Sequence, residues 1–393
     1  MYILYFMVFG IAAIGGSFIK INFAGISFTY ITIAFLFLSY INYFALNKGI
    51  IQLNKRSKAL MLFELYALIM VFLSILHLTE KFISQDLFTN TSFIPRQAYY
   101  IAVIPAIILM REEIYTKRLF QFLDKNSWVI FWTIYIIHIL YNKKFAISVP
   151  TVLILAFLSL YKDGNRWTKG SLIRFIIIVF TPIAVGGELT NLIIRCIYSF
   201  LFLYRKNLIK SVKLLKYVFI CMLACIFFLP LFTPLFELIF DANSFWRLSY
   251  WQDEIMQLFK SKMIGVGYGT SYATENFVGG LNVIGGPFGA TAEYSTLDKL
   301  FVTGPHCSYV AIAFRTGLIG IILFLYFIFS VINSIEINAN RIPIYTIFLL
   351  FSSIILIGVN VGLESPYYLI MFVFSLGLSY YNICQLRADK NEE

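Results

Sequence analysis

Residues 217–236 read YVFICMLACIFFLPLFTPLF, which is a run of 20 residues without a charged side chain. A helix needs about 20 predominantly apolar residues to cross the hydrocarbon core of a bilayer. This stretch therefore predicts a transmembrane helix, and we place the corresponding span at residues 215–237. Apolar runs of similar character recur on both sides of it, so the chain as a whole reads as a series of membrane spans.

The composition agrees with this interpretation. The chain has 393 residues, of which 60% are hydrophobic and 13% are charged, whereas roughly 25% of the residues in a soluble protein are charged. A soluble fold of this length cannot bury so much apolar surface, and disordered, coiled-coil and disulfide-scaffold classes are excluded by the same numbers. The runs are continuous rather than alternating, which excludes an outer-membrane barrel.

The fold class that we predict is all-α: a polytopic membrane protein with about twelve transmembrane helices and one large periplasmic loop. No basic segment precedes the first apolar run, so we expect a first span there rather than a cleaved signal peptide. The predicted spans are 2–19, 24–46, 59–78, 93–110, 127–141, 145–161, 171–186, 188–204, 215–237, 307–331, 343–361 and 366–384.

The net charge of +11 follows from this topology. With both termini in the cytoplasm, the inner loops hold 19 of the 31 Lys and Arg residues and the outer loops hold nine. The remaining three, Arg174, Arg195 and Arg315, lie within spans. This bias obeys the positive-inside rule, so the basic balance needs no nucleic-acid partner. The five cysteines form no C-x-x-C pair, and neither a zinc site nor a disulfide framework is indicated.

The domain organisation follows the same layout. Residues 1–237 form spans one to nine, residues 238–306 form the long periplasmic loop, and residues 307–393 form spans ten to twelve with a cytoplasmic tail. Function concentrates in long loops that a rigid scaffold carries. We therefore expect the chemistry in the segment 238–306.

An amphipathic helix is predicted in the first part of this loop. Asn243 or Ser244 can cap it, and Gly265 can end it. Helical spacing puts four residues on one face: Arg247, Trp251, Ile255 and Leu258. One interpretation is a helix lying at the membrane surface, with Trp anchoring it and Arg reaching the headgroups. The other is that an aromatic neighbour holds Arg247 against an anionic group of a lipid substrate.

Two further motifs follow along the chain. Residues 265–270, GVGYGT, have glycine at alternate positions, which allows either an anion-binding nest of backbone N–H groups or a plain turn after the helix. Residues 305–309, PHCSY, open the tenth span and put His306 at a helix N-terminus, where a neutral imidazole is favoured. His306 is then either a polar cap or a group able to accept a proton. The stretch 317–320, GLIG, predicts close helix packing.

The order of these motifs resembles the O-antigen polymerase and O-antigen ligase superfamily (Wzy-type and WaaL-type proteins). The resemblance covers about residues 244–330, together with the span layout. It implies a metal-independent, GT-C-like membrane glycosyltransferase without cofactor, in which Arg247 and His306 are the catalytic residues. Their substrate is an oligosaccharide on undecaprenyl pyrophosphate. Substrate-binding residues are expected at Trp251, Arg195, Gly265, Gly267 and Tyr268.

The chain departs from the family pattern at two positions. Cys307 stands where the family commonly has Asn, and Arg315 stands where an acidic residue is common. A structural ion pair is the role that we expect for Arg315. For Arg195, which is the nearest candidate for a further family arginine, contact with a lipid pyrophosphate and an ion pair with Glu188 or Glu237 both remain open.

The chemistry is consistent with a site that uses arginine. Breaking a sugar–pyrophosphate bond leaves negative charge on the leaving group, and no Asp-x-Asp motif is present to hold a metal ion. Guanidinium binds phosphate with two parallel hydrogen bonds and stays charged. The function that we expect is polymerisation of O-antigen or capsular repeat units at the outer face of the bacterial inner membrane, alongside a flippase and a chain-length regulator. The alternatives are a ligase acting on lipid A–core and a lipid-linked oligosaccharide transporter.

Overall fold

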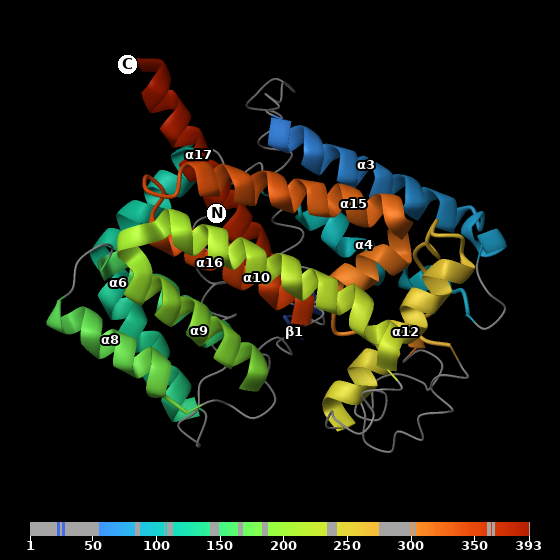
Figure 1. Cartoon of the computed structure of the whole chain (residues 1–393), viewed down its shortest axis with the longest axis horizontal. Helices are drawn as coiled ribbons and strands as arrows, with labels where there is room; N and C mark the ends of the chain where they lie inside the picture. Colours follow the sequence, from blue (N-terminus) through green and yellow to red (C-terminus); the bar gives the residue numbers. More distant parts are fainter. Residues whose placement is uncertain are drawn as a thin grey trace.

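The computed structural model describes residues 22–23, 26–27, 55–82, 87–105, 107, 113–141, 149–163, 168–182, 188–233, 242–274, 300–301, 304–359, 363 and 366–392. This part of the chain is almost entirely helical (Figure 1). Two short strands, β1 (Asn22–Phe23) and β2 (Ile26–Ser27), pair antiparallel. Strand β2 falls within the predicted span 24–46; the rest of that span and all of span 2–19 lie outside the described residues.

The longer helices follow one another along the chain and are joined in places by single 3-10 turns. The helix bounds are α3 (Lys55–Ile75), α4 (Ile94–Val103), α6 (Glu113–Tyr141), α7 (Val149–Asp163), α8 (Lys169–Phe180), α9 (Glu188–Tyr204), α10 (Leu208–Phe228), α12 (Ala242–Lys260), α15 (Ser308–Ile337), α16 (Ile344–Val359) and α17 (Pro366–Glu392). The 3-10 turns are η2 (Thr79–Phe82), η3 (Thr91–Phe93), η4 (Arg205–Asn207) and η5 (Leu229–Phe232).

Each of the ten other predicted spans overlaps one of these helices, although some of the helices are much shorter than the span, such as α4 with 10 residues and α8 with 12. The largest difference is at α6, which begins at Glu113 rather than near residue 127. Its first half carries the charged residues Lys117 and Arg118, so an apolar window detects only the second half. By length and hydropathy, three described segments qualify as membrane spans: Lys58–Ile75, Thr190–Phe232 and Ser308–Ile337.

Helix α16 lies in the interior of the helical assembly. Almost all of its residues are buried, including Ile347, Phe348 and Leu350, which are fully enclosed. A helix that is apolar on every side needs neighbours all round it, and α7, α9, α10 and α17 supply them. In a membrane the hydrophobic effect does not drive helices together, since lipid tails are as apolar as leucine side chains. Close van der Waals packing between the helices stabilises such an arrangement instead.

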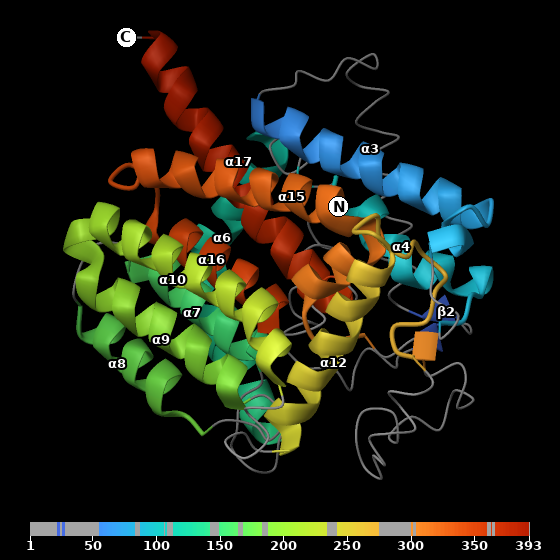
Figure 2. The same ribbon diagram turned by 45° about the vertical axis from the view of Figure 1, so that its right-hand side comes forward.

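Helix α15 packs along α3, and the two lie side by side in both views (Figures 1 and 2). The rings of Phe63 and Phe324 meet there with centroids 5.0 Å apart. The opposite face of α3 exposes large apolar side chains, with Leu65 59% and Phe72 61% exposed. An apolar face of this size needs an apolar surrounding, which agrees with a helix that faces lipid.

Candidate functional site

Helix α12 and the loop before α15 meet at the site that the sequence predicts. The indole Nε1 of Trp251 donates a hydrogen bond to the carbonyl oxygen of Pro305. One residue further on, the ring of His306 meets the ring of Trp246 edge to face, with centroids 5.2 Å apart. The guanidinium of Arg247 lies 5.7 Å from the centre of the Trp246 ring. The structure therefore brings Arg247, Trp251 and His306 together from segments that are far apart in the chain.

The protonation state of His306 follows from its surroundings. Burial, and then the positive charge of Arg247, lower the pKa of His306 to about 4. The imidazole is therefore neutral near pH 7. Its Nδ1 atom is buried and has no hydrogen-bond partner among the described residues. A buried polar atom without a partner is costly, so a bound ligand that bonds to Nδ1 would stabilise the site.

The expected place of His306 needs correction. Helix α15 begins at Ser308 with Cys307 at its N-cap, so His306 precedes the helix by two residues. It has a left-handed φ of 54°, which histidine adopts more often than most residues do. The causes that lower its pKa are burial and the positive charge of Arg247.

The ends of α12 also differ from the prediction. The helix begins at Ala242, so Asn243 and Ser244 lie in its first turn instead of capping it. It ends at Lys260, and a turn over residues 261–264 separates it from Gly265. Arg247, Trp251 and His306 are all only partly buried, so part of each side chain is open at the surface.

Sequence reasoning missed Glu254 as part of this site. Its side chain is completely buried, and its charge acts on the neighbouring Cys307 thiol, which is also fully buried. Glu254 is seven residues after Arg247 and three after Trp251, which places all three on one face of α12. That spacing could have identified it, whereas the adjacent pair Asp253 and Glu254 matches no Asp-x-Asp motif.

The segment 265–270 adopts a compact turn held against α15 and α4. Gly265, Gly267 and Gly269 all have positive φ, between 77° and 93°. The backbone N–H groups that an anion-binding nest would need are already bonded inside the protein, which favours the turn over the nest. These bonds are Val266 N to Phe314 O (2.9 Å), Gly267 N to Arg315 O (3.0 Å), Tyr268 N to Ser74 Oγ (2.8 Å) and Gly269 N to Gln97 Oε1 (2.7 Å).

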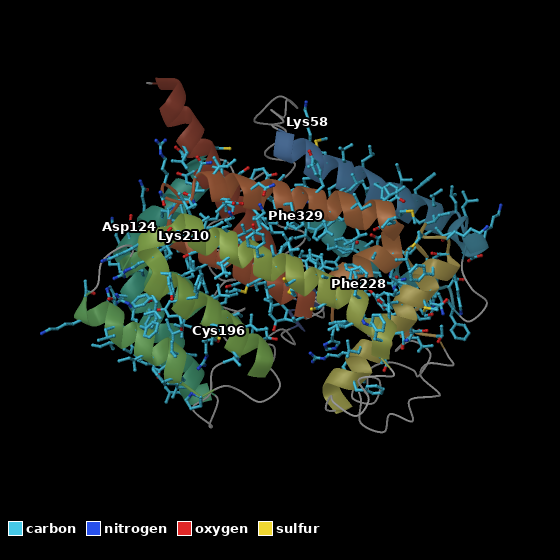
Figure 3. The ribbon with its side chains drawn as sticks, in the orientation of Figure 1. Lys58, Asp124, Cys196, Lys210, Phe228 and Phe329 are labelled. Carbon is cyan, nitrogen blue, oxygen red and sulfur yellow. The ribbon has the colours of Figure 1, made fainter. Side chains whose placement is uncertain are left out.

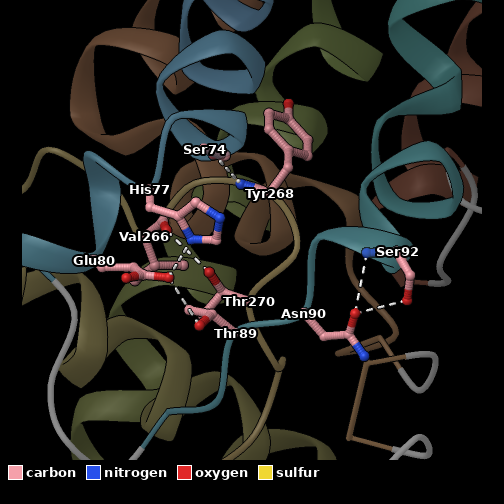
Figure 4. A network of polar contacts seen from close by, with 9 residues as sticks. All are labelled: Ser74, His77, Glu80, Thr89, Asn90, Ser92, Val266, Tyr268 and Thr270. Carbon is pink, nitrogen blue, oxygen red and sulfur yellow. Dashed lines mark hydrogen bonds and ion pairs between the residues drawn. The ribbon is translucent and has the colours of Figure 1, made fainter.

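Tyr268 anchors this segment to the helices behind it. Its hydroxyl lies 2.6 Å from that of Tyr100 on α4, and both side chains are buried. Figure 4 shows the neighbouring polar network, in which Glu80 bonds to His77 and Thr89. A hydrogen bond from His77 is the main cause that lowers the pKa of Glu80. The backbone N–H of Tyr268 bonds to Ser74 Oγ on α3 and its hydroxyl meets Tyr100 on α4, so Tyr268 is a structural anchor between these helices.

The stretch 317–320 forms a kink instead of a helix-packing surface. Gly317 has a φ of 69° inside α15. A Cβ atom there would overlap the carbonyl oxygen of Ile264, and one at Gly265 would overlap the backbone N of Gly317. Both positions therefore need glycine because the turn after α12 lies directly on the α15 backbone. Gly320 lies under the side chain of Thr316 in the same helix.

Arg315 does not form the ion pair that we predicted with any described residue. It is buried, and its Nη1 donates to the carbonyl oxygens of Thr270 (2.7 Å) and Gly267 (3.2 Å). Its guanidinium carbon lies 4.0 Å from the centre of the Tyr272 ring. Backbone carbonyls and an aromatic face replace a carboxylate, so Arg315 holds the glycine segment on α15.

Arg195 has a similar structural contact elsewhere in the fold. On α9 its Nη1 donates to the carbonyl oxygens of Val179 (2.8 Å) and Thr181 (2.6 Å), at the end of α8. The side chain of Glu188 and all of Glu237 lie outside what the structure describes, so the ion-pair alternative stays a prediction. The described contacts join Arg195 to α8 and not to Arg247 or His306.

Comparisons with protein-family models, with curated proteins and with solved structures give no match. Within the described residues, no group of three or more His, Cys, Asp or Glu side chains could hold a metal ion. The positive charge near His306 in this part of the structure comes from Arg247. The arrangement combines a guanidinium, a neutral imidazole and partly buried indole rings, which can bind an anionic group beside a sugar.

Proposed function

We propose that this protein is a membrane glycosyltransferase that polymerises polysaccharide repeat units carried on undecaprenyl pyrophosphate. The observation that supports this function most directly is the pairing of Arg247 with His306. A fixed positive charge lies beside a neutral imidazole whose Nδ1 has no partner among the described residues. The motif order that resembles O-antigen polymerases and ligases gives this pair its chemical interpretation.

In the reaction, a hydroxyl oxygen of the acceptor sugar attacks the anomeric carbon of the donor glycan. The bond between that carbon and the pyrophosphate oxygen breaks, and undecaprenyl pyrophosphate leaves. Arg247 binds the developing negative charge, which is the kind of preorganised contribution that typically stabilises a transition state by about 3–4 kcal/mol. The hydroxyl proton passes to solvent or to a neighbouring base.

His306 has a binding role in this proposal. A group with a pKa of about 4 is a weak base at neutral pH. Its neutral ring nitrogens can instead donate or accept hydrogen bonds with the acceptor hydroxyl or the pyrophosphate. Trp246, whose ring lies beside His306, offers aromatic surface that suits the apolar face of a sugar ring.

The proposed topology has about twelve spans, cytoplasmic termini and a periplasmic loop over residues 238–306 in a GT-C-like fold. The membrane is the bacterial inner membrane, and the lipid-linked oligosaccharide reaches the site from its outer leaflet. A flippase would supply this substrate, and a chain-length regulator would limit the product.

The decisive experiment uses purified protein with a synthetic undecaprenyl-pyrophosphate repeat unit in EDTA. We expect the unit to be elongated, and we expect Arg247→Ala to abolish elongation. Arg341→Ala is the matched control, because Arg341 is an exposed arginine in the turn between α15 and α16. Transfer only to lipid A–core would identify a ligase instead. Binding without elongation of a confirmed cognate substrate would rule out the polymerase.

A further inference from the structure

Helices α9 and α10 form a hairpin joined by the single turn η4 (Arg205–Asn207). Both helices belong to one apolar segment of 43 residues, Thr190–Phe232, which is too long for a single crossing. They lie side by side in both views (Figures 1 and 2). Two apolar helices that reverse at a short polar turn place that turn at a membrane surface.

Three lysines lie in this turn and in the first turns of α10. Lys206, Lys210 and Lys213 are all exposed. Lys206 lies in η4, and Lys210 and Lys213, three residues apart on α10, lie on one side of that helix. We call these three residues the lysine stripe. Lys210 is labelled in Figure 3, at the opposite end of α10 from Phe228.

The lysine stripe lies among apolar side chains that are themselves exposed. Ile209 is 44%, Leu214 49% and Tyr217 53% exposed. Apolar residues and lysines on the same outward side indicate a surface where acyl chains give way to headgroups. Long lysine side chains reach such a boundary by extending along the helix. Tyrosine is also enriched at this depth.

Lys216, the next lysine along α10, differs from these three because it forms an ion pair. Its Nζ lies 2.7 Å from Oε2 of Glu336 on α15, so this lysine has an internal partner. Among the described residues, no carboxylate pairs with the lysine stripe. The first three lysines therefore present their charge outward, toward the lipid headgroups, while the fourth is neutralised inside the fold.

We propose that Lys206, Lys210 and Lys213 form a binding site for the headgroups of anionic phospholipids at the membrane surface where α9 turns into α10. The phosphate and the net negative charge of such a lipid complement three lysines, whereas a zwitterionic headgroup has no net charge to offer. Each lysine near an anionic surface strengthens binding about fivefold. The inference requires only that the hairpin crosses a membrane, and it is independent of the proposed glycosyltransferase activity.

The test is native mass spectrometry of the full chain in detergent, titrated with phosphatidylglycerol and, separately, with phosphatidylcholine. We expect wild-type protein to retain phosphatidylglycerol preferentially. The triple variant K206Q/K210Q/K213Q should lose at least tenfold of that preference, and K206R/K210R/K213R should keep it. The matched control is K58Q/K125Q/K169Q, which removes the same charge from three exposed lysines elsewhere.

Two outcomes overturn the inference. One is an unchanged preference in the triple glutamine variant, and the other is an equal loss in the control, which would assign the effect to net charge alone. If the glutamine variant does not fold, salt titration of the wild-type complex replaces it. Because screening weakens contacts between exposed charges, retention of phosphatidylglycerol should fall with added salt, and salt-independent retention contradicts the site.

Discussion

The indole of Trp251 donates its N–H to the backbone carbonyl of Pro305, which joins α12 to the residue before His306. These partners are 54 residues apart in the chain. The contact fixes the distance between the helix that carries Arg247 and the loop that carries His306. We expect the relative position of these two groups to depend on this bond.

Replacement of Trp251 by Phe tests that dependence. The aromatic ring is kept, but the buried Pro305 carbonyl loses its donor, which typically costs about 1–3 kcal/mol. We expect a lower unfolding temperature in detergent together with shorter glycan product. Trp132→Phe on α6 is the control, since Trp132 contacts other rings. Equal behaviour of the two variants would show that the bond is unimportant.

Arg247 and Arg195 should respond differently to replacement by lysine. Arg195 donates to two backbone carbonyls, and an ammonium group can satisfy one of them. We therefore expect Arg195→Lys to keep elongation within about tenfold of wild type. Arg247→Lys should lose about 100-fold or more, because lysine lacks the planar pair of donors that grips a phosphate. Elongation rates at matched protein levels measure both, and a strong defect in Arg195→Lys alone would move Arg195 into the site.

His306 should make stability depend on pH between about 4 and 6.5. Its pKa falls to about 4 in the folded protein, against about 6.5 when unfolded. The unfolded chain therefore binds the proton more readily, so stability is complete above pH 6.5 and declines as the pH drops toward 4. The full loss is on the order of 3 kcal/mol.

The measurement is the unfolding temperature of wild type and His306→Gln at pH 7.5 and pH 5. Glutamine stays neutral throughout, so its curve should fall less steeply with acid than that of the wild type. Parallel curves for the two proteins would contradict the assigned burial of His306.

Gly317→Ala should destabilise the protein strongly. A left-handed φ and an overlap with the Ile264 carbonyl oxygen both oppose a Cβ atom there, and we expect a cost of about 3 kcal/mol or more. Gly170→Ala is the control. Gly170 lies in helix α8, and an added Cβ would be at van der Waals distance from the Trp128 side chain, so the change should be neutral or stabilising. The measurement is the thermal unfolding temperature of both variants. If Gly317→Ala were as stable as Gly170→Ala, the kink at Gly317 would be refuted.

The helices of this protein can be predicted from the sequence because each corresponds to a local run of apolar residues. Ten predicted spans overlap an observed helix, but only three described segments are long and apolar enough to cross a membrane. The first half of α6 was not predicted because it is charged. The meeting of Arg247 with His306 was anticipated from the order of motifs rather than from any local pattern. Periodicity within α12 says which residues share a face, but it does not say what that face meets.

Contacts between distant segments account for what the sequence did not predict. Arg315 was expected to meet a carboxylate, yet it binds carbonyls of a turn 45 residues away. Glu254 lies on an amphipathic helix, yet its side chain is completely buried and acts electrostatically on Cys307 at the start of α15. Gly317 has a pattern typical of helix packing, and only the position of Ile264 explains its left-handed backbone. In each case the contacting residue comes from a distant part of the chain and is determined by the tertiary fold.

The contact between Gly265 and Gly317 has an evolutionary consequence. Each glycine removes a steric obstacle for the backbone of the other segment, so replacing one creates a clash that no change at the second can relieve, because glycine is already the smallest residue. The two positions cannot exchange compensating substitutions. Among homologues we expect both positions to remain glycine, or both to change in proteins where the turn has a different structure. This pairing would help to identify distant relatives whose apolar spans no longer show sequence similarity.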